Sequence, residues 1–241
     1  MGLLAQTVIT LNMQIGGFQK TSLIDYPNHL ASIIWTPKCN FRCPFCYNKD
    51  LVFNELPLIE EKEVIDHLKK RRGVIEAVVI TGGEPTLQRG LTSFVKKVKK
   101  LGFLIKLDTN GTNPKILKKL LNEDLLNYVA MDIKASKDKY ERLTGVNGNI
   151  VAIEESVKII KKIAPDYEFR TTLAPGLLDE KDIKNIASWL KGSKRYVLQQ
   201  FQAEGKLIDK TLKEVKKISE TRLKKIKGEI KNSFDEVVLR I

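Results

Sequence analysis

Three cysteines lie close together in the chain, at Cys39, Cys43 and Cys46, and the 241-residue sequence has no others. An odd number of thiols at such short spacing does not suit a disulfide framework, whereas metals are commonly bound in this way. A four-iron cluster that only transfers electrons takes four cysteine ligands. Three ligands would leave one iron open to a further ligand, as a catalytic zinc keeps an open position. The spacing therefore indicates a metal centre with reactive chemistry.

Zinc is the alternative metal, and its site would need a fourth ligand from elsewhere in the chain. His29 or His67 could complete a Cys₃His set, but neither has the close spacing to the cysteines that zinc fingers show. The corresponding non-enzymatic hypothesis is a small iron–sulfur or zinc binding protein. Measuring the bound metal under anaerobic conditions distinguishes these hypotheses.

Other polar residues that could contact a ligand follow apolar segments of the sequence. The segment TGGEP contains Gly82, Gly83 and Glu84. Two adjacent glycines let the backbone approach a ligand closely, and a glutamate can accept a hydrogen bond from an ammonium group. Taken alone, the same segment is also an ordinary turn between a strand and a helix.

Two further segments, DTNG and MDIK, place Asp108 and Asp132 after apolar runs. Asn–Gly commonly marks a tight turn, and a terminal aspartate is often a helix cap, so both residues also have structural explanations. Arg170 lies in a segment otherwise suited to burial and there needs a carboxylate partner. A structural ion pair and a contact with a ligand explain this arginine about equally well.

The elements that position these residues are strands alternating with helices. Apolar runs predict strands at 30–36, 75–81, 103–109, 127–133, 167–173 and 195–201, and amphipathic stretches predict helices near 60–72, 87–101, 114–122, 151–163 and 179–190. Such alternation is typical of an α/β fold with a parallel sheet. Six units favour an open, partial (β/α)₆ barrel, two units short of a closed barrel, and a doubly wound sheet is the competing architecture. In either fold, functional residues gather at the carboxyl ends of the strands.

The ends of the chain are expected to add smaller elements to this core. Residues 13–29 are predicted to form a leading strand or hairpin. At the other end, residues 209–230 are predicted to form a basic amphipathic helix, and the tail 235–241 is predicted to form a short strand. No linker-like tract or internal repeat divides the sequence. We therefore expect one domain, with an extension at 1–12, a core at 13–204, and a C-terminal helix and strand at 205–241 packed on that core.

Composition narrows the functional classes. With 42% hydrophobic and 29% charged residues the chain is expected to be globular, which excludes disorder and collagen-like structure. No apolar run approaches the roughly 18 residues of a membrane helix, and we expect a cytoplasmic protein without a membrane partner. The net charge of +13 permits an acidic partner or nucleic acid, but a solvated lysine-rich surface is the commoner explanation. Basic patches interleaved with aromatic residues are scarce, so nucleic acid is not expected.

The sequence CNFRCPFC resembles the cluster loop of the radical S-adenosylmethionine (SAM) superfamily, and Phe45 is the aromatic residue before the last cysteine. The resemblance implies a 4Fe-4S cluster held by the three cysteines, with S-adenosylmethionine chelating the open iron. The GGE segment resembles the motif that holds the methionyl amine in this family. Phe45 and Tyr47 are then expected near the adenosyl part. The remaining cofactor-binding residues that we expect are Cys46, Asn48, Ile133, Lys134, Arg170 and Gln202.

The pair DTNG and MDIK resembles the subset of the family that activates glycyl radical enzymes. In that subset the two aspartates, here Asp108 and Asp132, help to bind a monovalent cation beside the cofactor carboxylate, and the lysine region contacts the cofactor. Oxygen ligands suit such a hard cation. Gln202 stands where relatives carry a cofactor-contacting histidine, which is a departure from the pattern.

The upstream segment GFQKTSLIDYP, together with CYN and its Asn48, resembles activators of anaerobic ribonucleotide reductase. The resemblance implies a radical SAM oxidoreductase whose 5′-deoxyadenosyl radical abstracts a glycine hydrogen from a partner, the anaerobic ribonucleotide reductase. It also implies an external electron donor such as flavodoxin or ferredoxin. The alternative is a radical SAM enzyme that acts on tRNA or a small metabolite.

Overall fold

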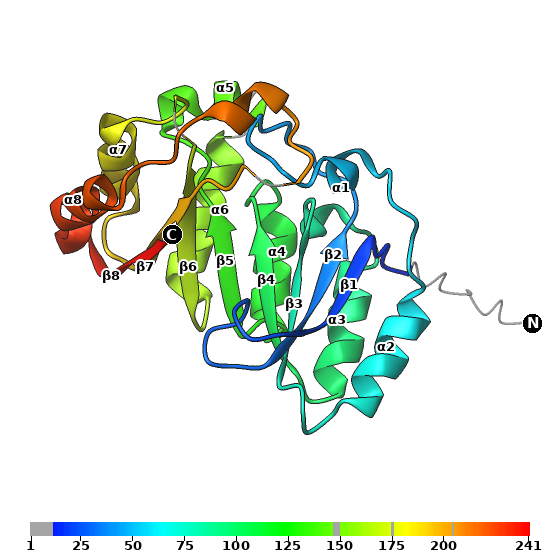
Figure 1. Cartoon of the computed structure of the whole chain (residues 1–241). Coiled ribbons are helices and arrows are strands. Elements are labelled where there is room, and N and C mark those ends of the chain that lie inside the picture. The colour runs from blue at the N-terminus through cyan, green and yellow to red at the C-terminus, as the bar shows by residue number, and fades with distance from the viewer. Residues whose placement is uncertain (1–11, 147–149, 175, 204) are drawn as a thin grey trace, which may run out of the picture.

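A computed structural model describes residues 12–146, 150–174, 176–203 and 205–241, and within them eight strands form one sheet (Figure 1). The strands follow one another in chain order: β1 (Gly17–Ser22), β2 (Ala31–Thr36), β3 (Ala77–Gly82), β4 (Leu104–Thr109), β5 (Tyr128–Asp132), β6 (Tyr167–Leu173), β7 (Ser193–Gln200) and β8 (Phe234–Arg240). β1 is antiparallel to β2, and the other neighbours are parallel. β1 and β8 form the two edges, which confirms the open, partial barrel.

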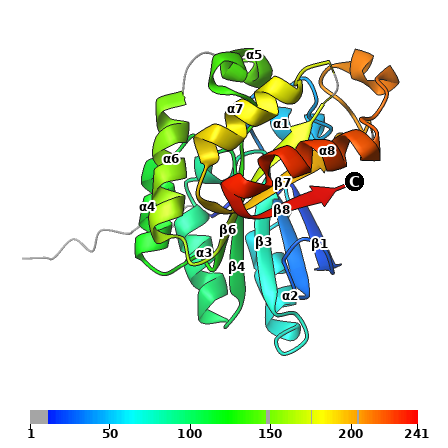
Figure 2. The same cartoon turned by 90° about the vertical axis from the view of Figure 1, so that its left-hand side faces the viewer.

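The longer helices lie along one face of this sheet, as Figures 1 and 2 show. The helices are α1 (Lys49–Phe53), α2 (Glu61–Lys70), α3 (Leu91–Lys100), α4 (Pro114–Asn122), α5 (Tyr140–Thr144), α6 (Ile150–Ile163), α7 (Glu180–Leu190) and α8 (Glu220–Ile230). α3 illustrates the pattern, since its Leu91, Phe94, Val95 and Val98 are buried at helical spacing while its lysines point outward. None of the described helices has the length and apolar character needed to cross a membrane.

The two faces of the sheet carry different side chains. Val78 and Ile80 of β3 belong to the large core between the sheet and the helices. Ala77 and Val79 alternate with them and pack on the inner face, where Tyr26 from the β1–β2 loop and Tyr128 complete a smaller apolar cluster. Small and aromatic residues thus fill the inner face near the amino ends of the strands. Charged residues occupy the inner face near the carboxyl ends of the strands.

Most of the predicted elements are confirmed, including all six strands, the five helices, the leading strand and the C-terminal strand. The helix predicted at 209–230 is wrong, because a 3-10 helix at Lys210–Glu214 and α8 occupy this range. Asp209 and Ser219 each cap a separate helix, and the Gln200 amide donates a hydrogen bond to the Ile218 carbonyl between them. The sequence did not predict α1 or α5. The extension predicted at 1–12 lies, apart from Asn12, outside the described residues.

The start of α4 provides a test of how local sequence stabilises the fold. The Asn113 side chain accepts a hydrogen bond from Ile116 N and donates one to the Thr86 carbonyl at 3.0 Å. Asn113→Ala should lower the free energy of unfolding by about 0.5–2 kcal/mol, because the cap is lost. Asn113→Asp keeps the cap acceptor and loses the donor to Thr86, so its stability should be intermediate. Denaturant unfolding checks this order, and an alanine variant as stable as the wild type would contradict it.

Candidate functional site

The cysteine loop (37–48) follows β2 at the carboxyl edge of the sheet. Cys43 is buried, and Cys39 and Cys46 are partly exposed. Arg42 shapes the loop from within, because its guanidinium donates to the carbonyls of Cys39 and Phe41 at 2.6 and 2.7 Å. The Arg42 amide also donates to the Thr144 carbonyl at the end of α5. The sequence did not single out Arg42, which stabilises the loop that carries all three thiols.

A segment from the far end of the chain also holds this loop. Residues 206–209, in the orange part of Figure 1, run beside the blue cysteine loop. Ile208 N donates to the Cys46 carbonyl and Asp209 N to the Pro44 carbonyl, both at 3.0 Å. Lys49 N donates to the Lys206 carbonyl. The path of the cysteine loop therefore depends on backbone bonds to residues that carry no recognisable motif.

Burial and one backbone hydrogen bond govern the acidity of the three thiols. Burial raises the pKa of Cys39 to about 11, against the hydrogen bond from Phe41 N, and raises that of Cys43 to about 12. The Cys46 pKa is raised by burial as well. Thiols must lose their protons to bind metal, so binding should release protons. Phe41 N lies 3.4 Å from Cys39 Sγ, and amide donors of this kind stabilise cluster sulfurs.

The structure does not support the Cys₃His zinc site. His29 precedes β2 and lies 3.4 Å from Glu76, whereas Cys39 follows the other end of the same six-residue strand. A strand of that length separates its ends by roughly 20 Å. His67 lies in α2 with its ring edge-on to Phe18. Among the described residues, no three His, Cys, Asp or Glu side chains, the three cysteines included, are grouped closely enough to hold a single metal ion.

The two glycines after β3 lie against the beginning of the cysteine loop. Gly82 has φ +117°, and a Cβ there would lie 2.3 Å from Thr36 N. A Cβ on Gly83 would lie 2.0 Å from the Lys38 carbonyl oxygen. Gly83 N donates to the Thr36 carbonyl and Glu84 N to that of Lys38, both at 2.8 Å. The glycines are therefore required by close contact between two backbones of this chain, and their predicted role in cofactor binding stays a prediction.

Glu84 is fully buried and connects the turns that follow β3 and β4. One carboxylate oxygen accepts from Thr86 N, Thr86 Oγ1 and Thr109 Oγ1 at 3.0, 2.6 and 2.8 Å, and the other accepts from Asn110 N at 2.6 Å. Burial raises the Glu84 pKa in spite of these bonds. The Asn110 side chain in turn donates from Nδ2 to Asn40 Oδ1 in the cysteine loop. Glu84 thus positions the carboxyl ends of neighbouring strands, and the predicted bond to the methionyl amine is untested.

Asp108, Asp132 and Arg170 meet on the inner face of the sheet, together with Lys106 and Lys134. We call these five residues the inner charge cluster. Arg170 Nη1 lies 3.0 Å from Asp108 Oδ2, and Arg170 Nε lies 2.9 Å from Asp132 Oδ1. Asp132 and Arg170 are register partners across β5 and β6. The sequence missed Lys106, although a lysine inside the apolar run FLIKLDT is an unusual strand residue.

Electrostatics favours the charged forms of the two aspartates, Lys134 and Arg170 in the inner charge cluster. Burial would raise the pKa of both aspartates, but Arg170 with Lys106 lowers that of Asp108, and Arg170 with Lys134 lowers that of Asp132. Burial would lower the pKa of Lys134, yet Asp132 and the nearby Cys43 raise it. The Lys134 ammonium lies 6.0 Å from the centre of the Phe45 ring. A buried, ionised group of charges therefore reaches the cysteine loop.

The other predicted site residues differ in their surroundings. Phe45 and Ile133 are buried, and Tyr47 is 53% exposed. Asn48 precedes α1 and bridges to Lys206. Gln202 accepts a hydrogen bond from Lys217 at the surface, and no described contact joins it to the inner charge cluster. The structure therefore brings Phe45 and Lys134 together and leaves Gln202 with a partner of its own.

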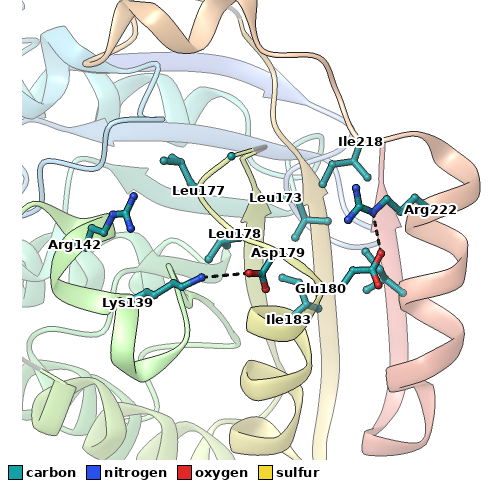
Figure 3. A pocket seen from close by; sticks show the side chains of 12 residues that line it. Lys139, Arg142, Leu173, Leu177, Leu178, Asp179, Glu180, Ile183, Ile218 and Arg222 are labelled. Carbon is teal, nitrogen blue, oxygen red and sulfur yellow. Dashed lines mark hydrogen bonds and ion pairs between the residues drawn. The ribbon is translucent and has the colours of Figure 1, made fainter.

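A cavity of about 290 Å³ lies between the end of β6 and the helices α5, α7 and α8 (Figure 3). Leu173, Ile183 and Ile218 supply apolar surface, and charged residues surround them. Four of these charged residues form two ion pairs, since Lys139 lies 3.5 Å from Asp179 and Arg222 lies 2.9 Å from Glu180. None of the residues that we predicted to bind the cofactor lines this cavity.

Gly83→Ala should disturb the cysteine loop, because the new methyl group would meet the Lys38 backbone rather than a flexible side chain. We expect a loss of about 1–3 kcal/mol in stability, typical of overpacking, together with less iron bound after anaerobic reconstitution. Gly228→Ala is the matched control, since a Cβ there meets no atom within 4 Å. Iron per chain and denaturant unfolding measure both effects. Full iron content in the Gly83 variant would contradict the expectation.

Glu84→Ala should leave buried donors without an acceptor and lower stability by at least about 1–3 kcal/mol. If Glu84 also binds the cofactor ammonium, S-adenosylmethionine affinity should fall about ten- to a hundredfold. Glu84→Gln retains one oxygen acceptor without the charge, so it should weaken the cofactor while unfolding closer to the wild type. Titration with S-adenosylmethionine and unfolding of both variants separate the roles. Unchanged affinity in both would leave Glu84 a structural residue only.

Comparison with known proteins agrees with this arrangement. The Radical SAM superfamily model matches residues 33–190. The chain is 32% identical to the Methanocaldococcus jannaschii protein named "Putative glycyl-radical enzyme activating enzyme MJ1227", over 94% of this chain and 95% of that protein. It is 34% identical to "Probable GTP 3',8-cyclase" of Thermococcus kodakarensis, over 60% of this chain and 47% of that protein, so it spans about half the length of this second relative.

Among solved structures, Streptococcus suis SuiB bound to its precursor peptide SuiA has a TM-score of 0.66 at 13% identity, covering 86% of this chain and 47% of SuiB. Identity at this level shows a shared fold and no more. The Radical SAM superfamily model, in contrast, matches a range of the sequence that includes the three cysteines, the GGE turn and the inner charge cluster. The chain belongs to the radical SAM superfamily.

Proposed function

We propose that this protein is a glycyl-radical-enzyme activating enzyme. The observation that carries the proposal is the similarity to the M. jannaschii relative of that name, which extends over nearly the whole of both chains. The GTP cyclase relative, in contrast, matches over only about half its length. The DTNG and MDIK segments support the same proposal, because both of their aspartates belong to the inner charge cluster.

Different residues of this chain would hold the cluster and the cofactor. Cys39, Cys43 and Cys46 would hold a 4Fe-4S cluster, and the GGE turn would hold the methionyl part of S-adenosylmethionine. When bound, these groups supply a reductively generated 5′-deoxyadenosyl radical, which removes a hydrogen atom from the substrate. The buried Phe41 and Phe45 of the cysteine loop would help to exclude water from that step, and Lys134 would contribute positive charge beside it.

The substrate would be a glycine on another protein. Among the described residues β1 and β8 are separate edges of the sheet, so the barrel does not close. We propose that a glycine-bearing loop of the partner enters by this open side. The partner would be an anaerobic ribonucleotide reductase, the electron would come from a flavodoxin or ferredoxin, and the reaction would take place in the cytoplasm.

A radical SAM enzyme that acts on a small metabolite is the second candidate. The 34% identity to the T. kodakarensis cyclase favours it, because the match includes more than half of this chain. A nucleotide substrate would also agree with the net charge of +13. Both candidates share the cluster chemistry and differ in the molecule that loses hydrogen.

Isotope transfer tests the proposal directly. The reconstituted, reduced protein is incubated with S-adenosylmethionine and a candidate reductase deuterated at glycine. We expect deuterium in 5′-deoxyadenosine, a persistent carbon-centred radical on the reductase, and cleavage of the reductase at one glycine on exposure to oxygen. The Cys43→Ala variant, which lacks one cluster ligand, is the control and should give none of the three.

Transfer of deuterium from a nucleotide or a tRNA, with the reductase unlabelled, would overturn the activating function. It would leave membership of the superfamily untouched. Cleavage of S-adenosylmethionine without transfer from any deuterated reductase would likewise count against a glycine on that partner.

A further inference from the structure

The inner charge cluster contains the two aspartates that the family resemblance assigns to a monovalent cation. Each of their four carboxylate oxygens lies within 3.2 Å of a cationic nitrogen of this chain, although at Asp108 Oδ1 the contact is an ion pair without hydrogen-bond geometry. Lys106 Nζ lies 2.8 Å from Asp108 Oδ1, and Lys134 Nζ lies 3.2 Å from Asp132 Oδ2. Arg170 takes the remaining oxygen of each aspartate, at 3.0 and 2.9 Å. An alkali cation at any oxygen of the pair would therefore lie beside an ammonium or guanidinium group.

The charge balance leads to the same conclusion. Two carboxylates face three cationic side chains, so the inner charge cluster carries one net positive charge. Glu168 Oε1 lies 3.9 Å from Arg170 without a hydrogen bond, and Glu168 Oε2 is paired with Arg240 at 2.9 Å, so this glutamate has a cationic partner outside the cluster. Adding a further cation would place like charges together in a buried region, where the repulsion is screened least. The residues present do not fit the monovalent cation.

We propose that the Arg170 guanidinium takes the place of the monovalent cation, bridging Asp108 and Asp132 so that cofactor binding needs no alkali metal. Arg170 is a positioning residue in this proposal, because it acts through the two aspartates. A guanidinium is always charged, and its planar fork presents donors in fixed directions, which suits a bridge between two carboxylates. The bridge joins the carboxyl ends of β4 and β5 to Arg170 in the middle of β6. The proposal concerns the cofactor site and holds whichever molecule loses hydrogen.

The wild-type protein provides the first test. S-adenosylmethionine affinity of the reconstituted protein is measured in potassium, sodium and tetramethylammonium chloride at equal ionic strength. The thermal midpoint of the metal-free protein is measured in the same three salts, which gives a readout independent of the cluster. We expect affinities within about twofold of one another and no alkali-specific change in midpoint. A saturable loss of tenfold or more in tetramethylammonium would overturn the proposal.

The Arg170→Gln variant provides the second test. Without the guanidinium, one oxygen of each aspartate is freed, so potassium or sodium should bind there. We expect cofactor affinity to fall about tenfold or more in tetramethylammonium and to recover in part with an alkali cation. The thermal midpoint of the metal-free variant should rise with the alkali cation as well. A purely structural role for Arg170 would give no such selectivity, and an Arg170→Gln protein indifferent to the cation would contradict the proposal.

Two further variants keep the test decisive. Arg170→Lys retains one positive charge and should need less alkali cation than Arg170→Gln, which matters if the glutamine variant does not fold. Arg195→Gln removes the same charge from β7, where Arg195 pairs with Glu236 and Tyr128 outside the inner charge cluster. This control should respond equally to all three salts. An alkali-specific response of the Arg195 variant would show a general effect of lost charge and would overturn the assignment to Arg170.

Discussion

The contact between the turn after β3 and the beginning of the cysteine loop is the constraint on which the rest of the site depends. Gly83 N and Glu84 N continue the hydrogen bonding of β2 and β3 past the ends of both strands. Only residues without a side chain allow this approach, since a Cβ on Gly83 would lie 2.0 Å from the Lys38 carbonyl oxygen. Cys39 follows directly, so backbone geometry rather than side-chain packing sets the position of the first thiol.

Glu84 extends the same constraint to the next strand. Its carboxylate is fully buried, and the bonds from Thr86, Thr109 and Asn110 compensate for that burial. Asn110 then returns to the cysteine loop through Asn40. The carboxyl ends of β2, β3 and β4 are thereby linked in a ring of hydrogen bonds. A cofactor bound here would meet a surface whose parts are held in fixed relation to one another.

The sequence predicted the elements and the chemical residues better than the contacts between them. Apolar runs located all six strands, and Asn113 with Pro114 located the start of α4, because these signals are local. The bonds of residues 206–209 to the cysteine loop could not be predicted, since backbone groups leave no mark in the residue types. The prediction of one helix at 209–230 was wrong for a related reason. Its amphipathic pattern was real, but Asp209 and Ser219 divide it into two capped helices.

The placement of the inner charge cluster follows from strand alternation and points toward function. Ile105 and Leu107 of β4 face the helices, so Lys106 and Asp108 between them face inward. Apolar residues of similar volume would often stabilise such a core as well as buried ions do, so stability alone does not account for five charged groups here. The same residues place Lys134 beside the cysteine loop, where burial raises the Cys43 pKa and the charge of Lys134 opposes that rise. Arg170 lies between both aspartates and lowers the pKa of each against the effect of burial, while Lys134 places a positive charge beside the loop that carries the three thiols.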